Sequence, residues 1–252
     1  MRSVTLPWLG PNDPFPAVSG AWDTSSPAPG LLAAGGSLSV ENLSTAYRSG
    51  IFPWYSEGQP ILWWSPDPRM VLQVAQFRVH RSLRQTLQRF RADASCEIRI
   101  DHDFAGVITA CSQVPRAGQA GTWIGEDMIE AYIRLHQAGI AHSIETWIDG
   151  QRIGGLYCVA IGHAVFGESM FSLQPDASKI ALAALVALCR HQGIERIDCQ
   201  QNTPHLARLG AHEVPRTQFT VQVALACQQA PVEWLFKPLY WDEILRLAPA
   251  SG

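Results

Sequence analysis

The spacing of apolar residues predicts helices along much of the chain. Between Val79 and Phe90 the apolar residues recur every three or four positions and therefore share one helical face. The same spacing predicts helices from Asp127 to Ala138 and from Val40 to Ser49, with Ser39 as the N-cap of the latter. The stretch from Ser178 to His191 is almost wholly apolar and rich in Ala and Leu. That composition predicts a helix buried on all sides.

Apolar runs bounded by turn residues predict strands in the second half of the chain. Two of them, Ile140 to Ile148 and Arg152 to Ile161, flank the dipeptide Asp149-Gly150, which is typical of a tight hairpin. Further strands are predicted from Val165 to Phe171 and from Ile194 to Gln200. Because the buried helix connects these last two, we expect them to be parallel. The order of elements from residue 96 onward predicts an α+β fold with a mixed or antiparallel sheet.

The N-terminal quarter of the chain has a different character. Residues 1–36 are rich in Pro and Gly and show little periodicity, so we expect an irregular arm. Between residues 51 and 69 the chain holds three tryptophans and four prolines. Because Pro removes backbone donors, we expect this segment to form a rigid aromatic surface rather than an ordinary strand or helix.

Composition narrows the class of protein. With 252 residues, of which 47% are hydrophobic and 16% charged, the chain can bury a sizeable core and is not disordered. Its net charge of −3 means that any RNA contact must come from a local basic patch. All but two of the basic residues are arginine, whose planar guanidinium suits phosphate, although GC-rich coding also explains this bias.

Neither a metal site nor a membrane segment is predicted. The six cysteines have no CxxC spacing, and their positions in apolar stretches indicate free thiols in a reducing compartment. The chain begins without a signal-peptide pattern, and its longest apolar run, Ile180 to Cys189, is too short to span a bilayer. We therefore expect a soluble, cytoplasmic protein.

Three polar residues in apolar surroundings are candidates for chemistry. Glu168 interrupts an apolar strand, where a carboxylate needs either a partner or a cavity; an exposed edge or an ion pair with an arginine are alternatives. Asp198 and Gln200 lie two apart on a predicted strand and would project from one face, with Cys199 turned toward the core. Such a pair could hold an attacking amine and receive its proton, or could simply form a polar sheet edge. The segment from Gly167 to Phe171 lacks the last glycine of a G-x-S-x-G elbow, which argues against a serine hydrolase.

Several motifs taken together resemble those of the leucyl/phenylalanyl-tRNA–protein transferases. They follow the family's order between about Gly30 and Pro215, and they include Phe52 to Tyr55, Pro60 to Arg69, Gly121 to Ile124, Gly154 to Tyr157, Gly167 to Ser172 and Ile197 to Gln200. The resemblance implies a small N-terminal domain, residues 1–67, and a C-terminal acetyltransferase-like (GNAT) domain with a mixed sheet, residues 68–252.

The resemblance also implies an activity. Without metal or coenzyme, the enzyme would move leucine or phenylalanine, and less readily methionine, from aminoacyl-tRNA to proteins that begin with Arg or Lys, which marks them for degradation. We expect it to act as a monomer.

The resemblance further implies roles for individual residues. The catalytic polar region corresponds to Glu168, Asp198 and Gln200. Stacking would hold the terminal adenosine of the tRNA against four aromatic rings, those of Trp54, Trp123, Tyr47 and Tyr132. Phosphates of the tRNA would meet the basic helix at Arg81, Arg84 and Arg89, unless this is only a solvated face. The transferred side chain would enter an apolar pocket formed by Leu156, Val165, Met170, Leu182, Leu185 and Ile197.

The sequence leaves three points open. Aliphatic residues replace the Met and Phe that often line the family's pocket, so the preference between Leu and Phe is undecided, and these residues could also be ordinary core. A CoA-dependent N-acetyltransferase is a second possible function, although Ser172 to Ser178 lacks the glycine-rich pyrophosphate loop that this chemistry needs. A tRNA-binding module without catalysis is the third.

Overall fold

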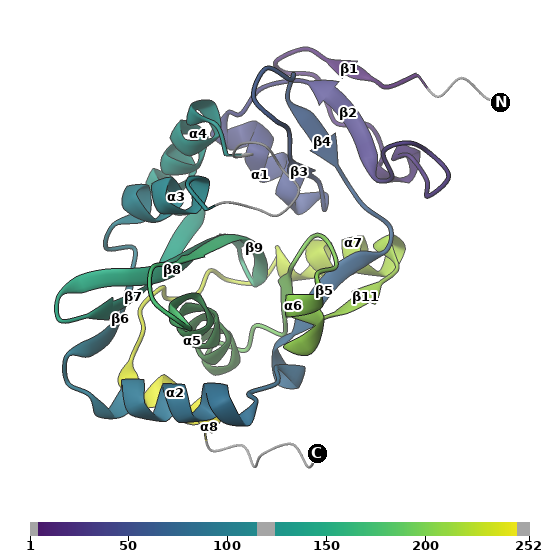
Figure 1. Cartoon of the computed structure of the whole chain (residues 1–252). Helices are drawn as coiled ribbons and strands as arrows, with labels where there is room; N and C mark the ends of the chain where they lie inside the picture. The colour runs from purple at the N-terminus through teal and green to yellow at the C-terminus, as the bar shows by residue number, and fades with distance from the viewer. Residues whose placement is uncertain (1–4, 115–123, 246–252) are drawn as a thin grey trace.

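A computed structural model describes residues 5–114 and 124–245 of the chain, which contain two β-sheets (Figure 1). The smaller, N-terminal sheet has the strand order β1-β2-β4-β3. Its first pair is parallel and the others are antiparallel. Its strands are short: β1 (Trp8–Leu9), β2 (Leu31–Gly35), β3 (Phe52–Pro53) and β4 (Leu62–Trp64).

The larger sheet has the strand order β11-β5-β10-β9-β8-β7-β6. Strands β9 and β10 are parallel, as predicted from the helix between them, and every other neighbouring pair is antiparallel. The mixed sheet confirms the α+β class. Its strands are β5 (Arg69–Gln73), β6 (Cys96–Ile100), β7 (Ala141–Ile148), β8 (Gln151–Ile161), β9 (Ala164–Ser172), β10 (Arg196–Asp198) and β11 (His212–Val214).

The helices predicted from apolar spacing are present within a few residues of their expected ends. They are α1 (Val40–Arg48), α2 (Arg81–Ala92), α4 (Glu126–Gln137) and α5 (Ala177–His191). The Ser39 hydroxyl accepts the backbone N–H of Asn42, which confirms the predicted cap of α1. The others are α3 (Phe104–Ser112), α6 (Pro204–Arg208), α7 (Arg216–Ala226) and α8 (Asp242–Leu245), with 3₁₀ turns at Val18–Gly20, Val74–Gln76 and Pro238–Trp241.

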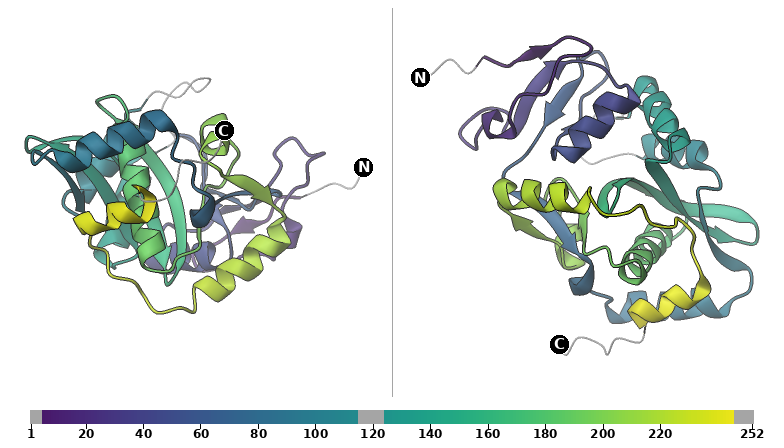
Figure 2. Two further views of the ribbon diagram at one scale, coloured as in Figure 1. Left: turned by 90° about the horizontal axis from the view of Figure 1, so that it is seen from below. Right: turned by 180° about the vertical axis from the view of Figure 1, so that it is seen from behind.

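Helices cover both faces of the larger sheet. Helix α5 packs against β7, β8 and β9, with α2 and α8 outside it, while α3 and α4 contact the sheet from the other side (Figures 1 and 2). The N-terminal sheet and α1 lie beyond α4, and one apolar cluster runs from Trp63 through Tyr47 and Tyr132 to Phe166. The two sheets therefore share a core, and a domain boundary after residue 67 stays a prediction.

Two expectations for the N-terminal region were wrong. Residues 31–35 within the expected irregular arm form β2, because the run Leu-Leu-Ala-Ala can be buried on both faces. The aromatic segment is not a surface: Trp63 is fully buried, and Phe52 and Tyr55 are less than a tenth exposed. It does form strands, because Pro53 lies on the edge strand β3, where its missing N–H costs no ladder bond.

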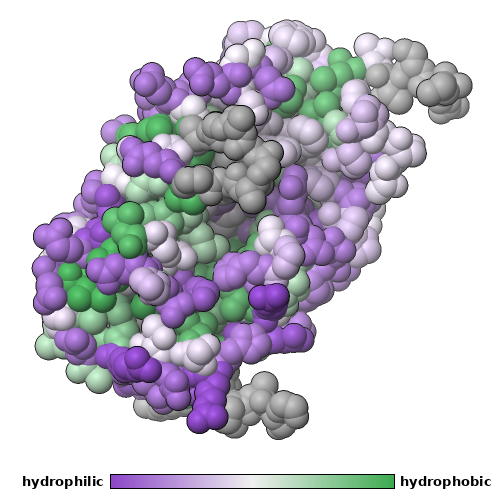
Figure 3. Space-filling view, in the orientation of Figure 1, coloured by the Kyte–Doolittle hydropathy of each residue, from purple (hydrophilic) through white to green (hydrophobic). Residues whose placement is uncertain are grey.

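The molecular surface is mixed in polarity. Figure 3 shows apolar patches toward the left of the face viewed in Figure 1 and another at its upper right, with hydrophilic residues between and around them. No helix within residues 5–114 or 124–245 is long and apolar enough to cross a membrane.

Candidate active site

Glu168 lies in a β-bulge of β9. Opposite it on β8, Tyr157 pairs with Ser169 and Cys158 pairs with Gly167, so Glu168 is the extra residue without a partner. A bulge turns one side chain out of the regular alternation and is common beside active sites. Here it turns the carboxylate toward α1 and α4, where the hydroxyl of Tyr47 donates to Oε1 at 2.9 Å.

Two fully buried tyrosines stand behind this carboxylate. The hydroxyls of Tyr47 on α1 and Tyr132 on α4 are hydrogen-bonded to each other, and that of Tyr132 also lies 3.4 Å from Oε2 of Glu168. Burial, followed by the nearby Glu168 charge, raises the pKa of both phenols well above its usual range. Both rings lie within the core and present no face to a base. The tyrosines thus reach the site through their hydroxyls, in contrast to the stacking role that we expected.

Burial raises the pKa of Glu168 to about 8. The Asp198 charge acts in the same direction, whereas the hydrogen bonds from Tyr47 and Tyr132 and the charge of Arg69 oppose it. The side chain is half-buried, so it remains within reach of a substrate. Near neutral pH this carboxyl group can therefore exchange a proton.

Asp198 and Gln200 meet in a different way from the one predicted. The strand expected to continue to Gln200 ends at Asp198, because Gln200 has a left-handed backbone with a φ of 56°. The Asp198 Oδ1 atom accepts the backbone N–H of Gln200 at 3.0 Å, and the Gln200 side-chain amide donates to Glu168 Oε1 at 3.0 Å. The three predicted catalytic residues are thus joined by hydrogen bonds. Cys199 packs against the apolar cluster around α5, as predicted.

Arg69 is the residue at this site that sequence reasoning missed. It is fully buried at the start of β5 and binds Asp198 with two parallel bonds, Nε to Oδ1 at 2.8 Å and Nη2 to Oδ2 at 2.6 Å. A sequence signal was present, because an arginine that leads an apolar run enters the sheet with that run and must then find a counter-charge. The sequence left open an ion pair between Glu168 and an arginine, but the buried arginine at this site pairs with Asp198.

The six predicted pocket residues belong to one apolar cluster between the sheet and α5. Five of them, all except Met170, are at most 5% exposed, and Met170 is half-buried. The six residues therefore lie together in one closely packed part of the core. Met170, two residues beyond Glu168, is the member that reaches the surface.

The other residues predicted to contact tRNA are two tryptophans and three arginines of α2. Trp54 is half-buried and packs edge-on against Trp64, with ring centroids 5.4 Å apart, whereas Trp123 lies outside the described residues. On α2, Arg81 and Arg89 are exposed. Arg84 is half-buried and donates to the backbone carbonyl of Leu245 at 2.6 Å, so part of its guanidinium is already engaged.

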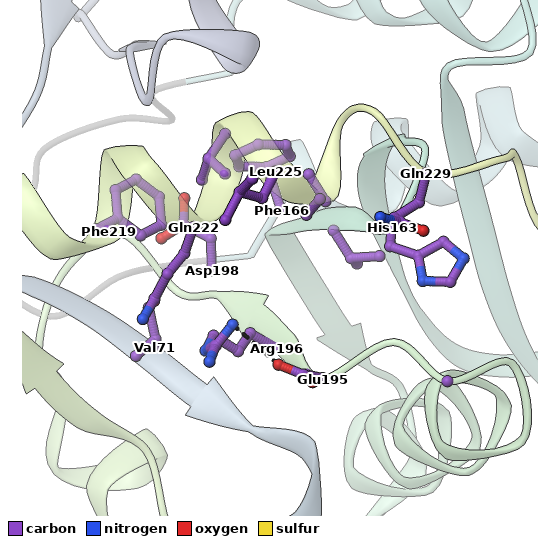
Figure 4. Close-up of a pocket in the computed structure, with 15 residues that line it drawn as sticks. Val71, His163, Phe166, Glu195, Arg196, Asp198, Phe219, Gln222, Leu225 and Gln229 are labelled. Carbon is purple, nitrogen blue, oxygen red and sulfur yellow. Dashed lines mark ion pairs between the residues drawn. The ribbon is translucent and has the colours of Figure 1, made fainter.

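A cavity of about 520 Å³ lies between α7 and strands β5, β9 and β10, behind Asp198 (Figure 4). Its walls include Val71, Phe166 and Phe219. The two carboxylates that line it each face an arginine: Asp198 is bound by Arg69, and Glu195 lies 3.1 Å from Arg196. With both charges compensated, this cavity is a poor receptor for a cationic side chain. Among the described residues, no three His, Cys, Asp or Glu side chains are grouped as metal ligands.

The sequence matches known proteins along most of its length. The family model for leucyl/phenylalanyl-tRNA protein transferase matches residues 71–224, and the model of that family's N-terminal domain matches residues 36–67. A leucyl/phenylalanyl-tRNA–protein transferase of Albidiferax ferrireducens is 60% identical over 240 residues, 95% of this chain and 94% of the relative. One from Paraburkholderia xenovorans is 57% identical over 246 residues, 98% of this chain and 100% of the relative.

Among solved structures, the chain is similar to an aminoglycoside N-acetyltransferase. The sequence identity is 18% and the TM-score is 0.30, over 56% of this chain and 92% of the other. The two relatives cover 95% and 98% of this chain and the two family models match most of it, so the chain belongs to the leucyl/phenylalanyl-tRNA–protein transferase family.

Proposed function

We propose that this enzyme transfers leucine or phenylalanine, and less readily methionine, from aminoacyl-tRNA to proteins that begin with Arg or Lys. Family membership supports the aminoacyl transfer. The observation that carries the assignment of residues is the position of Gln200, whose backbone N–H donates to Asp198 and whose side-chain amide donates to Glu168. The modified proteins are proposed to be marked for degradation, with the enzyme acting as a monomer.

The reaction needs alignment and proton transfer rather than activation, since the aminoacyl ester is already reactive. The acceptor's α-amine attacks the ester carbonyl, a C–N bond forms, the ester C–O bond breaks, and the ribose oxygen leaves with a proton. The Gln200 amide nitrogen is engaged by Glu168, so its oxygen is the atom that can accept a hydrogen bond from the amine. Asp198 orients this amide through the backbone of Gln200.

Recognition of the acceptor's basic residue is assigned to Glu168. Asp198, the other carboxylate of the site, is unsuited to this role, because its side chain is only 2% exposed and is compensated by Arg69. Glu168 is half-buried and makes no ion pair among those found in the described part of the chain. An incoming cation would favour its ionised form.

The tRNA contacts are divided between two regions. Trp54 and Trp123 are proposed to stack on the terminal adenosine, and Tyr47 and Tyr132 to support Glu168 through their hydroxyls. Arg81 and Arg89 are proposed to contact phosphates, with Arg84 beside them. The half-buried Met170 would form the mouth of the side-chain pocket, with the other five residues of that cluster behind it.

The test is transfer from charged leucyl-tRNA and phenylalanyl-tRNA to four peptides that differ only in their first residue: Arg, Lys, Ala or Glu. Mass spectrometry should show extension of the Arg and Lys peptides and little of the other two. Equal yields on all four peptides would remove the acceptor rule. The same peptides with labelled acetyl-CoA should stay unmodified, and tRNA binding without any product would favour a simple binding module.

A further inference from the structure

The Arg69 guanidinium is held from four sides. Besides the two bonds to Asp198, its Nη1 donates to the backbone carbonyl of Gly50 at 3.1 Å. The rings of Phe52 and Phe219 lie on it, with their centroids 4.7 and 4.6 Å from the central carbon. These contacts come from the turn after α1, from β3, from α7 and from the end of β10. Arg69 thus connects both sheets at one buried point.

The buried carboxylate of Asp198 depends on Arg69 for its stability. Its side chain is 2% exposed, and a carboxylate so deeply buried is strongly disfavoured unless a cation and hydrogen bonds compensate for lost water. Oδ1 accepts both the Arg69 Nε–H and the backbone N–H of Gln200. The same oxygen therefore joins the arginine to the residue that faces the substrates.

Gln200 in turn needs Asp198. A left-handed backbone is rarely adopted by a residue other than glycine, asparagine or aspartate, and surrounding contacts must hold it there. The Asp198 carboxylate supplies one such contact, and the backbone N–H of Met70 supplies another by donating to the Gln200 carbonyl at 3.3 Å. Met70 is the neighbour of Arg69 on β5, so both contacts lead back to the start of that strand.

We propose that Arg69 is a positioning residue for the transfer reaction, which acts through Asp198 to hold Gln200 in its left-handed conformation with its amide at Glu168. This inference rests on the roles proposed above for Asp198 and Gln200. Arg69 touches neither substrate in this role. It acts on the rate of the chemical step rather than on substrate binding.

The test is a double-mutant cycle of Arg69→Met, Asp198→Asn and both together, with kcat and KM measured for each variant. Arg69→Met should lower kcat by about 100-fold, the effect of a misplaced reacting group, and change the KM for aminoacyl-tRNA little. The double variant removes both buried charges, so it should fold even if Arg69→Met alone does not. Because the two residues act in series, it should be no slower than the slower single variant.

The pH profile separates positioning from a merely structural role. The Arg69 charge lowers the pKa of Glu168 and the Asp198 charge raises it. The apparent pKa near 8 in the pH profile of kcat should therefore rise in Arg69→Met and fall in Asp198→Asn. The polar and titratable groups around Glu168 that stay unchanged are Tyr47 on α1, Tyr132 on α4, Cys158 on β8 and Gln200 after β10.

Two further variants complete the experiment. Arg69→Lys keeps the charge without the two-pronged geometry, so kcat should lie between the parent and Arg69→Met. Arg190→Met removes another half-buried arginine, which donates to the carbonyls of Val74 and Glu243, and should lower the melting temperature while leaving kcat unchanged. Two results would overturn the inference. One is a loss of kcat in the double variant that equals the product of the two single losses, and the other is an apparent pKa of the kcat profile that does not change in the variants. If Asp198→Asn alone leaves kcat unchanged, the roles of Asp198 and Gln200 fail and this inference fails with them.

Discussion

The neighbouring strands β9 and β10 each carry a carboxylate at the site, Glu168 in the bulge of β9 and Asp198 at the end of β10, and the two have opposite surroundings. Asp198 is buried against Arg69, which binds both of its oxygens. Glu168 is half-buried, accepts hydrogen bonds from two tyrosine hydroxyls and an amide, and has its pKa raised to about 8 by burial. The first carboxylate is committed to holding the backbone, while the second is free to exchange a proton and meet a substrate.

This difference shows why a site with two acidic residues need not carry a large negative charge. Asp198 and Arg69 together carry no net charge, and the raised pKa leaves Glu168 mostly protonated at neutral pH. A cationic acceptor would therefore be attracted less by the resting site than by the site once Glu168 is ionised. The four predictions below test this division of labour, starting with the largest expected effect.

Removing the compensated carboxylate should cost the most stability. Asp198→Ala leaves Arg69 buried without its counter-charge, so unfolding free energy should fall by roughly 3–5 kcal/mol. Glu97→Ala breaks an exposed pair with Arg99 and should cost about 1 kcal/mol or less. Urea denaturation measures both. Similar losses in the two variants would show that the Arg69–Asp198 pair is no more important than a surface pair.

The raised pKa of Glu168 should appear as a pH dependence of stability. Because the folded pKa of about 8 lies above the ordinary 4.5, the folded state holds the proton more tightly, and stability falls as pH rises from about 4.5 to 8. Glu168→Gln should remove this decline. The difference between the two pKa values corresponds to about 5 kcal/mol, which solvent screening of the half-buried side chain should reduce to the order of 2–3 kcal/mol. Denaturation at pH 5, 7 and 9 measures it, and Glu97→Gln should keep the parent's decline. Parallel pH curves for parent and Glu168→Gln would contradict the assignment.

The pocket cluster lies on the α5 side of the sheet, away from Tyr47 and Tyr132, and can be tested separately from the carboxylates. Leu185→Phe should narrow the proposed pocket and lower transfer of Phe more than of Leu. Leu185 is fully buried, so overpacking should also cost roughly 1–3 kcal/mol. Both transfer rates are measured beside the melting temperature. An unchanged Leu-to-Phe ratio with a lowered melting temperature would mean that these residues are only core.

The smallest effect is expected on α2, far from both carboxylates. Arg81 is exposed, so Arg81→Ala should weaken tRNA binding and lower the log–log salt slope by about one unit or less. Arg84 donates to the Leu245 carbonyl, so Arg84→Ala should affect stability more than the salt slope. Filter binding between 50 and 200 mM salt (roughly the range over which phosphate contacts are lost) measures this. If Arg81→Ala changes neither affinity nor slope, the helix is a solvated face.

Much of the fold could be predicted from local pattern. The hairpin of β7 and β8 follows from Asp149-Gly150, whose two residues both have positive φ, as such turns require. The buried helix α5 and the parallel pairing of β9 with β10 follow from one apolar run between two strands. Strand β5 and helix α7 were missed, because β5 follows a proline-rich segment and α7 has little amphipathic contrast.

The site was less predictable, because its geometry depends on departures from regular structure. Alternation along a strand put Asp198 and Gln200 on one face, but the left-handed backbone of Gln200 ends the strand between them. The bulge at Glu168 depends on its pairing with β8, which the sequence of β9 alone does not reveal. The contact between Arg69 and Asp198 spans 129 positions and requires the completed sheet.

The role of Gln200 is tested most directly by single-turnover transfer from phenylalanyl-tRNA to a peptide that begins with Arg, in the parent and in Gln200→Ala. If the Gln200 amide orients the attacking amine, the rate of the chemical step should fall by about 100-fold while the affinity for aminoacyl-tRNA stays the same. A parent-like rate, or a loss explained entirely by weaker tRNA binding, would contradict that role.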